Sequence, residues 1–251
     1  MTTPKISLQH IAKTYVQNGE MLPVLDEITL AVQPGEFVSL IGPSGCGKST
    51  IFQIITGLVR QDNGIINIDG RETDRGVRKM GYMPQKDLLM PWKRLLDNAV
   101  IPLEISGVPR REAETKVREL LPVFGLAGFE RAYPSELSGG MRQRAALLRT
   151  MLIDSDILLL DEPFGSLDAM NREKMQEWLL SVWEKFRRSV LFITHSIDEA
   201  VFLSDRIYVL SDRPARVTLE VAVELPRPRD GHIMTTPEFA RYKEILLQRL
   251  E

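Results

Sequence analysis

The sequence is poor in cysteine and has no excess of one charge sign. Cys46 is the only cysteine among 251 residues, which excludes an internal disulfide framework and fits a reducing compartment. The 32 lysines and arginines nearly balance the 34 aspartates and glutamates, leaving a formal net charge of -2. Broad nucleic-acid binding usually shows as a basic excess, so we expect no nucleic-acid partner.

Long apolar runs, internal repeats and low-complexity tracts are also missing. No apolar stretch approaches the roughly 20 residues that a membrane-spanning helix needs, and the N-terminus lacks the apolar segment of a secretory signal. We therefore expect a cytoplasmic protein, whose work at any membrane would depend on a partner. The length allows one large domain or two small ones with a sizeable core.

Apolar runs of strand length alternate with amphipathic segments, which predicts an α/β fold of βαβ type. Strands are expected at Ile6–Leu8, Ile28–Val32, 36–42, 64–70, 79–85, 156–163 and 189–195, with a possible hairpin from 205–210 and 216–225. Helices are expected at 48–58 with an end near Gly57, at 111–126 with Val117, Leu120, Leu121 and Phe124 on one face, at 172–186 and at Pro237–Leu250.

Helical spacing dominates the middle of the chain, so we predict a helical segment inserted into an α/β core. The predicted division of the single domain 1–251 is a core of about 1–86 and 153–225, a helical subdomain of about 87–152, and a tail of 226–251 that carries the last helix.

One glycine-rich stretch carries a specific chemical signal. The segment GPSGCGKS (Gly42–Ser49) matches G-x-x-x-x-G-K-[ST], between a predicted strand and a predicted helix. Its glycines let backbone N–H groups turn toward a phosphate, Lys48 can reach the β- and γ-phosphates, and Ser49 can offer its hydroxyl to Mg²⁺. The candidate nucleotide-binding residues are Gly42, Pro43, Ser44, Gly45, Cys46, Gly47, Lys48, Ser49 and Thr50, with no chemistry assigned to the Cys46 thiol.

Polar residues follow the predicted strands at the ends where sheets of this kind bind ligands. Asp161 would hold Mg²⁺, and the adjacent Glu162 would act as a general base toward water. Gln85 could contact both the metal ion and that water. His195 follows another strand, and a histidine at such a position serves either the site or the local structure.

A second glycine-rich turn, LSGGMRQR (Leu137–Arg144), precedes a predicted helix. Ser138, Gly139 and Gly140 offer exposed N–H groups and a hydroxyl, which together make an anion site. A single chain that holds one nucleotide has no evident need of two such sites. The other interpretation is a helix N-cap that happens to contain glycines.

In this order, the motifs resemble the ATP-binding subunit of an ABC transporter over nearly the whole chain. The resemblance implies a P-loop NTPase core with a mixed β-sheet, and two such subunits paired head to tail on two ATP molecules with Mg²⁺. The turn at Leu137–Arg144, called the signature turn below, then closes on the nucleotide of the other chain, and His195 senses the γ-phosphate. The resemblance also implies a D-loop at Ser166–Asp168 whose Asp168 connects the sites, and an adenine stacked on Tyr15.

Two further stretches, MPWKRLLDNAVIPLEISG (90–107) and HSIDEAVFLSDRIYVLSDRPARV (195–217), resemble subunits of importers for nitrate, alkanesulfonates, taurine and related solutes. The resemblance implies an ATPase on the cytoplasmic face of the membrane, a transmembrane permease and an extracytoplasmic solute-binding protein. Trp92 and Leu95 would face the permease or belong to the core. The sequence leaves four questions open. These are which solute is carried, how the protein is regulated, whether it imports or exports, and whether it pairs with a second copy or with a sister subunit. A non-transport ABC ATPase acting on nucleic acid or ribosomes and a P-loop kinase are the alternative functions.

Overall fold

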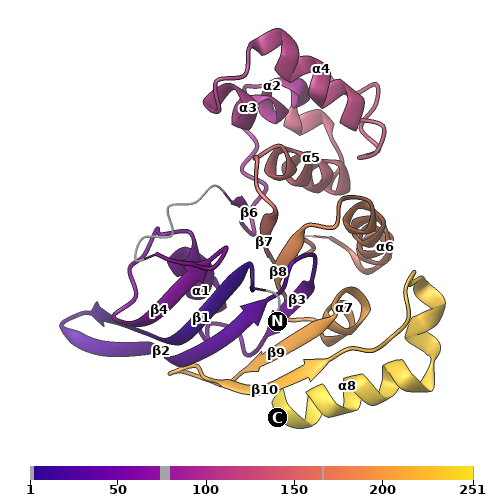
Figure 1. Ribbon diagram of the computed structural model, residues 1–251. Helices are drawn as coiled ribbons and strands as arrows, with labels where there is room; N and C mark the ends of the chain where they lie inside the picture. Colours follow the sequence, from indigo (N-terminus) through magenta and orange to yellow (C-terminus); the bar gives the residue numbers. More distant parts are fainter. Residues whose placement is uncertain (1–2, 74–79, 166, 251) are drawn as a thin grey trace. The chain divides into compact units, whose positions relative to one another are not determined.

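The computed structural model describes residues 3–73, 80–165 and 167–250. The chain divides into two compact units, Met1–Arg78 with Arg187–Glu251, and Lys79–Phe186, which are described separately (Figure 1). The strands of the first unit are β1 (Ile6–Gln17), β2 (Glu20–Val32), β3 (Phe37–Ile41), β4 (Asn63–Ile68), β5 (Arg71–Glu72), β8 (Ser189–Ile193), β9 (Arg206–Leu210) and β10 (Val217–Ala222). Its helices are α1 (Lys48–Ile55), α7 (Ile197–Leu203), the 3-10 helix η2 (Gly231–Thr235) and α8 (Pro237–Leu250).

One sheet of the first unit is organised around β3. Both β8 and β9 run parallel to β3, and every residue of β3 and β8 is buried. Burial on both faces explains why these strands appear in the sequence as continuous apolar runs. β10 pairs antiparallel with β9, which confirms the predicted hairpin, although β10 covers less of its predicted segment.

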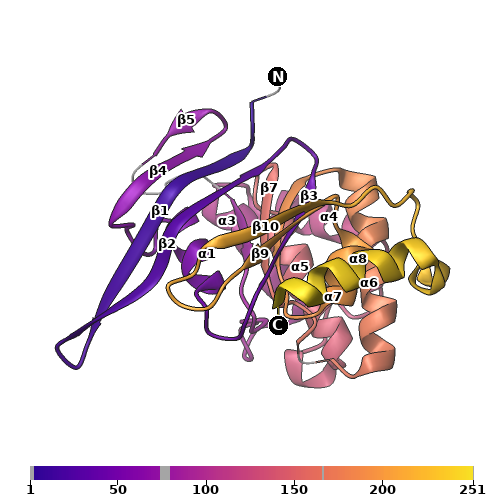
Figure 2. The same ribbon diagram turned by 90° about the horizontal axis from the view of Figure 1, so that it is seen from below.

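The other sheet of the first unit is antiparallel, in the order β2-β1-β4-β5. β1 and β2 are much longer than predicted and form an extended hairpin, visible in Figure 2. Asn18 and Gly19 make its turn, with φ angles of 53° and 83°. An Asn-Gly pair is the usual signal for such a turn. The sequence does not show this turn clearly, because Val16 and Met21 beside it are apolar although they are exposed, which breaks the alternation of the flanking strands.

The end of α1 was correctly predicted from the sequence. The helix stops at Ile55, and Gly57 follows with φ of 74°. The Gly57 N–H donates to the Ile54 carbonyl over 3.0 Å. A glycine in this left-handed conformation closes a helix without steric cost.

The second unit contains the inserted helical segment and a parallel strand pair. Its elements are β6 (Gly81–Met83), α2 (Leu95–Ala99), α3 (Ile101–Ile105), α4 (Arg110–Leu120), the 3-10 helix η1 (Pro134–Glu136), α5 (Gly139–Met151), β7 (Ile157–Asp161) and α6 (Ala169–Phe186). β6 and β7 pair in parallel. This unit is larger than the predicted helical subdomain because it includes β6, β7 and α6. The boundaries of the predicted helical subdomain, near residues 87 and 152, stay a prediction.

α4 is shorter than the helix predicted at 111–126. It ends at Leu120, two residues before Pro122, which has no N–H to continue the hydrogen bonds of the helix. The predicted apolar face nevertheless forms part of the core, since Val117, Leu121 and Phe124 are all buried.

The C-terminal helix was also correctly predicted, and it lies beside α7 (Figure 2). Lys243 of α8 forms an ion pair with Asp198 of α7 over 2.6 Å. The buried Arg229 guanidinium donates to backbone carbonyls at the end of α7, including those of Val201 and Ser204. These carbonyls have no partner within a helix, so Arg229 both caps α7 and anchors the tail.

Candidate functional site

The predicted phosphate-binding loop, residues 42–47, joins the buried strand β3 to the N-terminus of α1. Gly45 and Gly47 have φ angles of 77° and 124°, which side-chain-bearing residues rarely adopt. A Cβ at Gly47 would lie 2.8 Å from the Leu25 side chain and 2.9 Å from that of Val24. The backbone path of this loop therefore favours glycine at both positions. The motif specifies the glycine at 47, whereas Gly45 stands at one of its variable positions.

Lys48 begins α1, and its side chain folds back over the loop. Its Nζ donates to the carbonyls of Gly42 and Pro43, each over 2.8 Å, and the residue is only 6% exposed. A buried ammonium group needs such acceptors, and phosphate oxygens are acceptors of the same kind. Ser49 is exposed and Thr50 half-buried in the first turn of α1, where helix N–H groups favour an anion.

Cys46 lies inside the loop with a side chain that is almost fully buried. Its Sγ is 4.0 Å from the Lys48 Nζ. Burial raises the pKa of the Cys46 thiol, and the nearby ammonium of Lys48 opposes that rise only in part. The thiol is therefore protonated at neutral pH, which agrees with assigning it no chemistry.

Tyr15 is a half-buried residue of β1 that pairs with Leu22 of β2. The Lys13 Nζ lies 5.4 Å from the centre of the Tyr15 ring, at cation–π distance. The stacking of adenine on this ring stays a prediction.

His195 is exposed directly after β8, and buried polar groups hold the chain on both sides of it. The Thr194 hydroxyl donates to the Glu199 carboxylate, and the Ser196 N–H donates to the Thr194 oxygen over 3.0 Å. Ser196 caps α7 by accepting from the Glu199 N–H over 3.3 Å. Glu199 was not singled out in the sequence, although an acid in the first turn after a serine cap is a recognisable signal.

In the second unit, the structure brings Gln85 and Glu162 together. The Gln85 Nε2 donates to the Glu162 Oε2 over 3.2 Å. Asp161 is buried at the end of β7, and Glu162 follows it with φ of 44°. A non-glycine residue in the left-handed region is strained, and such strain is typical of functional sites.

The signature turn caps α5, because the Ser138 Oγ accepts from the Met141 N–H over 3.3 Å. Gly139 and Gly140 begin the helix without positive φ. A Cβ on Gly139 would be 3.6 Å from the nearest neighbouring atom and one on Gly140 3.9 Å, which are ordinary contact distances. Neither the backbone nor the local packing therefore explains these two glycines.

Asp168 is exposed just before α6, and its carboxylate accepts from the Asn171 N–H over 3.0 Å and from the Asn171 side-chain amide over 2.6 Å. These hydrogen bonds lower the pKa of Asp168. Ser166, the first residue of the predicted D-loop, lies outside the described residues.

The predicted site residues are thus distributed over both units. Tyr15, the phosphate-binding loop and His195 belong to the first, and Gln85, Ser138–Gly140, Asp161, Glu162 and Asp168 belong to the second. Over the described ranges, no group of three histidine, cysteine or acidic residues is arranged to hold a metal ion. No helix in those same ranges is both long and apolar enough to cross a membrane.

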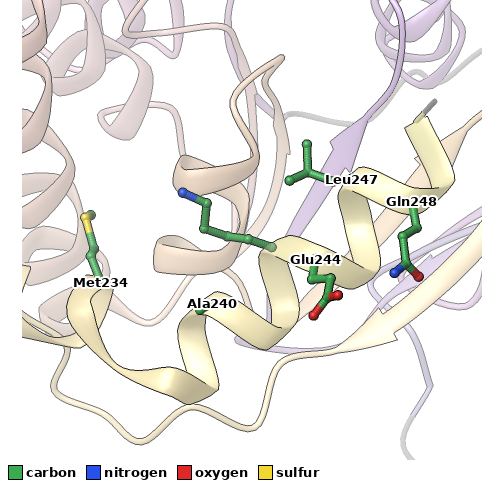
Figure 3. A pocket seen from close by; sticks show the side chains of 6 residues that line it. Met234, Ala240, Glu244, Leu247 and Gln248 are labelled. Carbon is green, nitrogen blue, oxygen red and sulfur yellow. The ribbon is translucent and has the colours of Figure 1, made fainter.

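A pocket of about 500 Å³ lies along α8, away from every predicted site residue in the sequence (Figure 3). Its lining residues are Met234, Ala240, Lys243, Glu244, Leu247 and Gln248. It contains one lysine, but neither a glycine-rich loop nor the end of a parallel strand, so it does not resemble the predicted phosphate site.

A buried strand, a glycine loop with an inward lysine, and a following helix define a P-loop nucleotide-binding protein. The family model described as ABC transporter matches residues 25–165, so this chain belongs to the ABC transporter family.

Relatives match along nearly the whole chain. The chain is 42% identical to the ABC transporter ATP-binding protein MJ0412 of Methanocaldococcus jannaschii, over 98% of this chain and 91% of that protein. It is 39% identical to the aliphatic sulfonates import ATP-binding protein SsuB of Bacillus cereus, over 98% and 96%. It is 42% identical to the taurine import ATP-binding protein TauB of Rhizobium johnstonii, over 90% and 88%.

Two solved structures of one ABC cassette are similar in fold. The dimeric structure of MJ0796, a bacterial ABC transporter cassette, has a TM-score of 0.77 and 31% identity, and covers 88% of this chain and 100% of that one. A dimeric post-hydrolysis state of the same cassette, bound to ADP and phosphate, matches with the same TM-score, the same coverage and 30% identity.

Proposed function

We propose that this chain hydrolyses ATP as the motor subunit of an importer for a small anionic or zwitterionic solute of the sulfonate and taurine class. The observation that carries the proposal is the near full-length match to relatives named for sulfonate and taurine import. The phosphate-binding loop supports the ATPase part, because its glycine path and inward Lys48 are features that a nucleotide phosphate requires.

The reaction would be an in-line attack of water on the γ-phosphate. Lys48 and the loop N–H groups would neutralise developing charge, and Glu162 would orient the water and accept its proton. Gln85, hydrogen-bonded to Glu162, would hold the carboxylate in place until a nucleotide enters. His195 would contact the γ-phosphate, and the departure of that phosphate after hydrolysis would break the contact.

The proposed Mg²⁺ donors are chemically suitable. The Ser49 hydroxyl, the Gln85 amide and the Asp161 carboxylate are hard oxygen ligands of the kind that Mg²⁺ takes together with substrate phosphates. A site with a single carboxylate would depend on the nucleotide for its remaining ligands. When bound, the ion would neutralise charge on the β- and γ-phosphates.

The glycines of the signature turn support a head-to-tail dimer. Gly139 and Gly140 have no local steric reason to be glycine, which supports a role in admitting a group from outside the second unit. The γ-phosphate of a nucleotide on a second copy, approaching the N-terminus of α5, would be such a group. The dimeric cassette of similar fold is consistent with this pairing.

A groove on the second unit suits a permease. Apolar side chains of α3 line this groove of about 370 Å³, together with Met90 and Ile153. Ile105 is 82% exposed there, and Trp92 nearby in sequence is 73% exposed. Clustered exposed apolar groups mark interaction surfaces. Leu95, the other candidate for this surface, is buried and belongs to the core.

The test is to tag the chain in its native cell, extract membranes in mild detergent and identify the proteins that co-purify. We expect a polytopic permease, a location on the cytoplasmic face and a solute-binding protein encoded for the same system. ATP hydrolysis by the purified complex should rise when that binding protein carries its solute. Recovery of the chain with ribosomes or DNA, and without a permease, would overturn the transport function.

A further inference from the structure

The loop between β9 and β10, Ser211–Arg216, contacts the phosphate-binding loop directly. The Arg213 guanidinium donates through Nε to the Gly45 carbonyl. Gly45 has no side chain, and a Cβ there would lie 3.2 Å from the Arg213 Nη2. The missing side chain thus leaves the space in which the guanidinium lies. The two residues are 168 positions apart, so no motif connects them.

The β9–β10 loop is itself held firmly against β2. The Ala215 N–H donates to the Val24 carbonyl and the Asp26 N–H donates to the Ala215 carbonyl, each over 2.9 Å. Arg216 also donates to the Asp26 carboxylate over 3.0 Å. Arg213 is therefore presented from an anchored backbone, although its own side chain is exposed.

The contact with Arg213 has a direct consequence for the peptide between Gly45 and Cys46. In a planar trans peptide, the C=O and the N–H point in opposite directions. The carbonyl of Gly45 points outward to Arg213, and the N–H of Cys46 points across the loop, where it donates to the Pro43 carbonyl over 3.3 Å. Rotation of this peptide would turn the N–H away from the interior of the loop.

We propose that Arg213 is a positioning residue for nucleotide binding, which acts by fixing the Gly45–Cys46 peptide with its carbonyl outward and its N–H on the inner side of the phosphate-binding loop. The inference rests on the proposed ATPase function. Arg213 need not touch the nucleotide, because its effect passes through the carbonyl of Gly45. The phosphate-binding loop would hold the phosphates that ATP and ADP share, so the loss of Arg213 should weaken the binding of both nucleotides equally.

A hydrogen bond from Arg213 to Gly45 and a simple attraction between Arg213 and the nucleotide respond differently to salt. A positive charge that only attracts the anionic nucleotide through space would lose its influence in high salt. A hydrogen bond that sets a peptide orientation keeps its influence. Lysine keeps both the charge and a donor for the Gly45 carbonyl, so Arg213→Lys should preserve much of the function that Arg213→Ala removes, and the salt dependence decides between the two effects.

The experiment measures Kd for ATP and ADP, together with KM and kcat, for wild type, Arg213→Ala and Arg213→Lys. Arg241→Ala removes one exposed positive charge from α8 and serves as the matched control. For Arg213→Ala we expect Kd for both nucleotides to rise roughly five- to tenfold, the size of one lost hydrogen bond. KM should rise in parallel, kcat should change less than about twofold, and the nucleotide-free thermal midpoint should stay within a degree or so.

Partial restoration by lysine, and a Kd ratio that is the same at about 0.05 M and about 0.5 M salt, would support the positioning role. Equal affinities in wild type and Arg213→Ala would overturn it, as would a ratio that vanishes in high salt or a matching loss in Arg241→Ala. If the wild type itself binds no nucleotide, the proposed ATPase function fails, which is a distinct result.

Discussion

The side-chain amide of Gln85 donates a hydrogen bond over 3.2 Å to the carboxylate of Glu162. One residue follows β6 and the other follows β7, and the parallel pairing of these strands brings their carboxyl ends together. The hydrogen bond orients the Glu162 carboxylate. This contact makes the role of Glu162 as general base directly testable.

We expect Glu162→Gln to bind ATP normally and to lose turnover. The amide cannot accept a proton from water, so kcat should fall by about 10²- to 10⁴-fold, the usual contribution of a general base. Phosphate release measures turnover, and gel filtration with ATP should show a trapped dimer. Glu173→Gln, an exposed acid on α6, is the matched control. Normal turnover in Glu162→Gln would remove Glu162 from the role of base.

The left-handed backbone at Glu162 predicts that Glu162→Gly is more stable than Glu162→Ala, which reverses the usual order of these two residues. With φ of 44°, an alanine at this position keeps the strain of the left-handed region, whereas glycine relieves it. In ordinary helices and strands glycine is the less stable of the two by about 0.5–1 kcal/mol. Here Glu162→Gly should be more stable than Glu162→Ala, by about 1 kcal/mol in urea unfolding. A less stable glycine variant would contradict the strain.

Head-to-tail pairing predicts rescue when two inactive chains are mixed. Lys48→Ala damages the phosphate-binding loop, and Gly140→Asp places a negative charge at the signature turn. The aspartate should not disturb folding, because a Cβ at Gly140 meets only ordinary contacts and acids suit a helix N-terminus. If each site combines the loop of one chain with the signature turn of the other, the mixed dimer has one intact site.

ATP-dependent dimerisation and ATP hydrolysis should therefore be absent from each pure variant and partly restored in the mixture. A signature turn that served its own chain's nucleotide would leave both sites of the mixed dimer defective. Failure of the mixture, with both variants folded by circular dichroism, would argue against exchange between chains.

The carboxylate of Glu199 should position His195 through its hydrogen bond with Thr194. Glu199→Ala removes the acceptor and frees the segment before the histidine, so we expect kcat to fall several-fold with little change in ATP affinity. Glu199→Gln still offers a carbonyl oxygen to the hydroxyl and should keep most of the activity. Steady-state kinetics of both variants measures this difference. Equal losses would indicate that the negative charge, not the hydrogen bond, is what matters.

Cys46 should react slowly with maleimide in the folded protein, and its rate should keep rising at alkaline pH. Burial raises the pKa of this thiol, so the reactive thiolate forms at a higher pH in the folded chain than in the unfolded one. Because Cys46 is the only cysteine, mass spectrometry of the labelled chain reports this one site. A folded-state profile that matches the urea-unfolded one would contradict the buried, raised-pKa thiol.

Much of the fold could be predicted because its signals are local. The continuous apolar runs became buried strands β3, β7 and β8, since two covered faces need apolar residues throughout. The glycine at the end of α1 was readable for the same reason. The long β1–β2 hairpin was underestimated because register shifts in β1 interrupt the alternation, and because Val16 and Met21 near the turn are apolar although they are exposed.

The sequence by itself predicted the chemistry proposed for this protein, because the phosphate-binding loop, the acids at the end of β7 and the glycines of the signature turn are short, local patterns. Only the tertiary structure decided which distant groups support them. Arg213 reaches Gly45, and Leu95 is buried while Trp92 is exposed. Such contacts arise when strands far apart in the chain become neighbours in a sheet, and local sequence carries no information about that pairing.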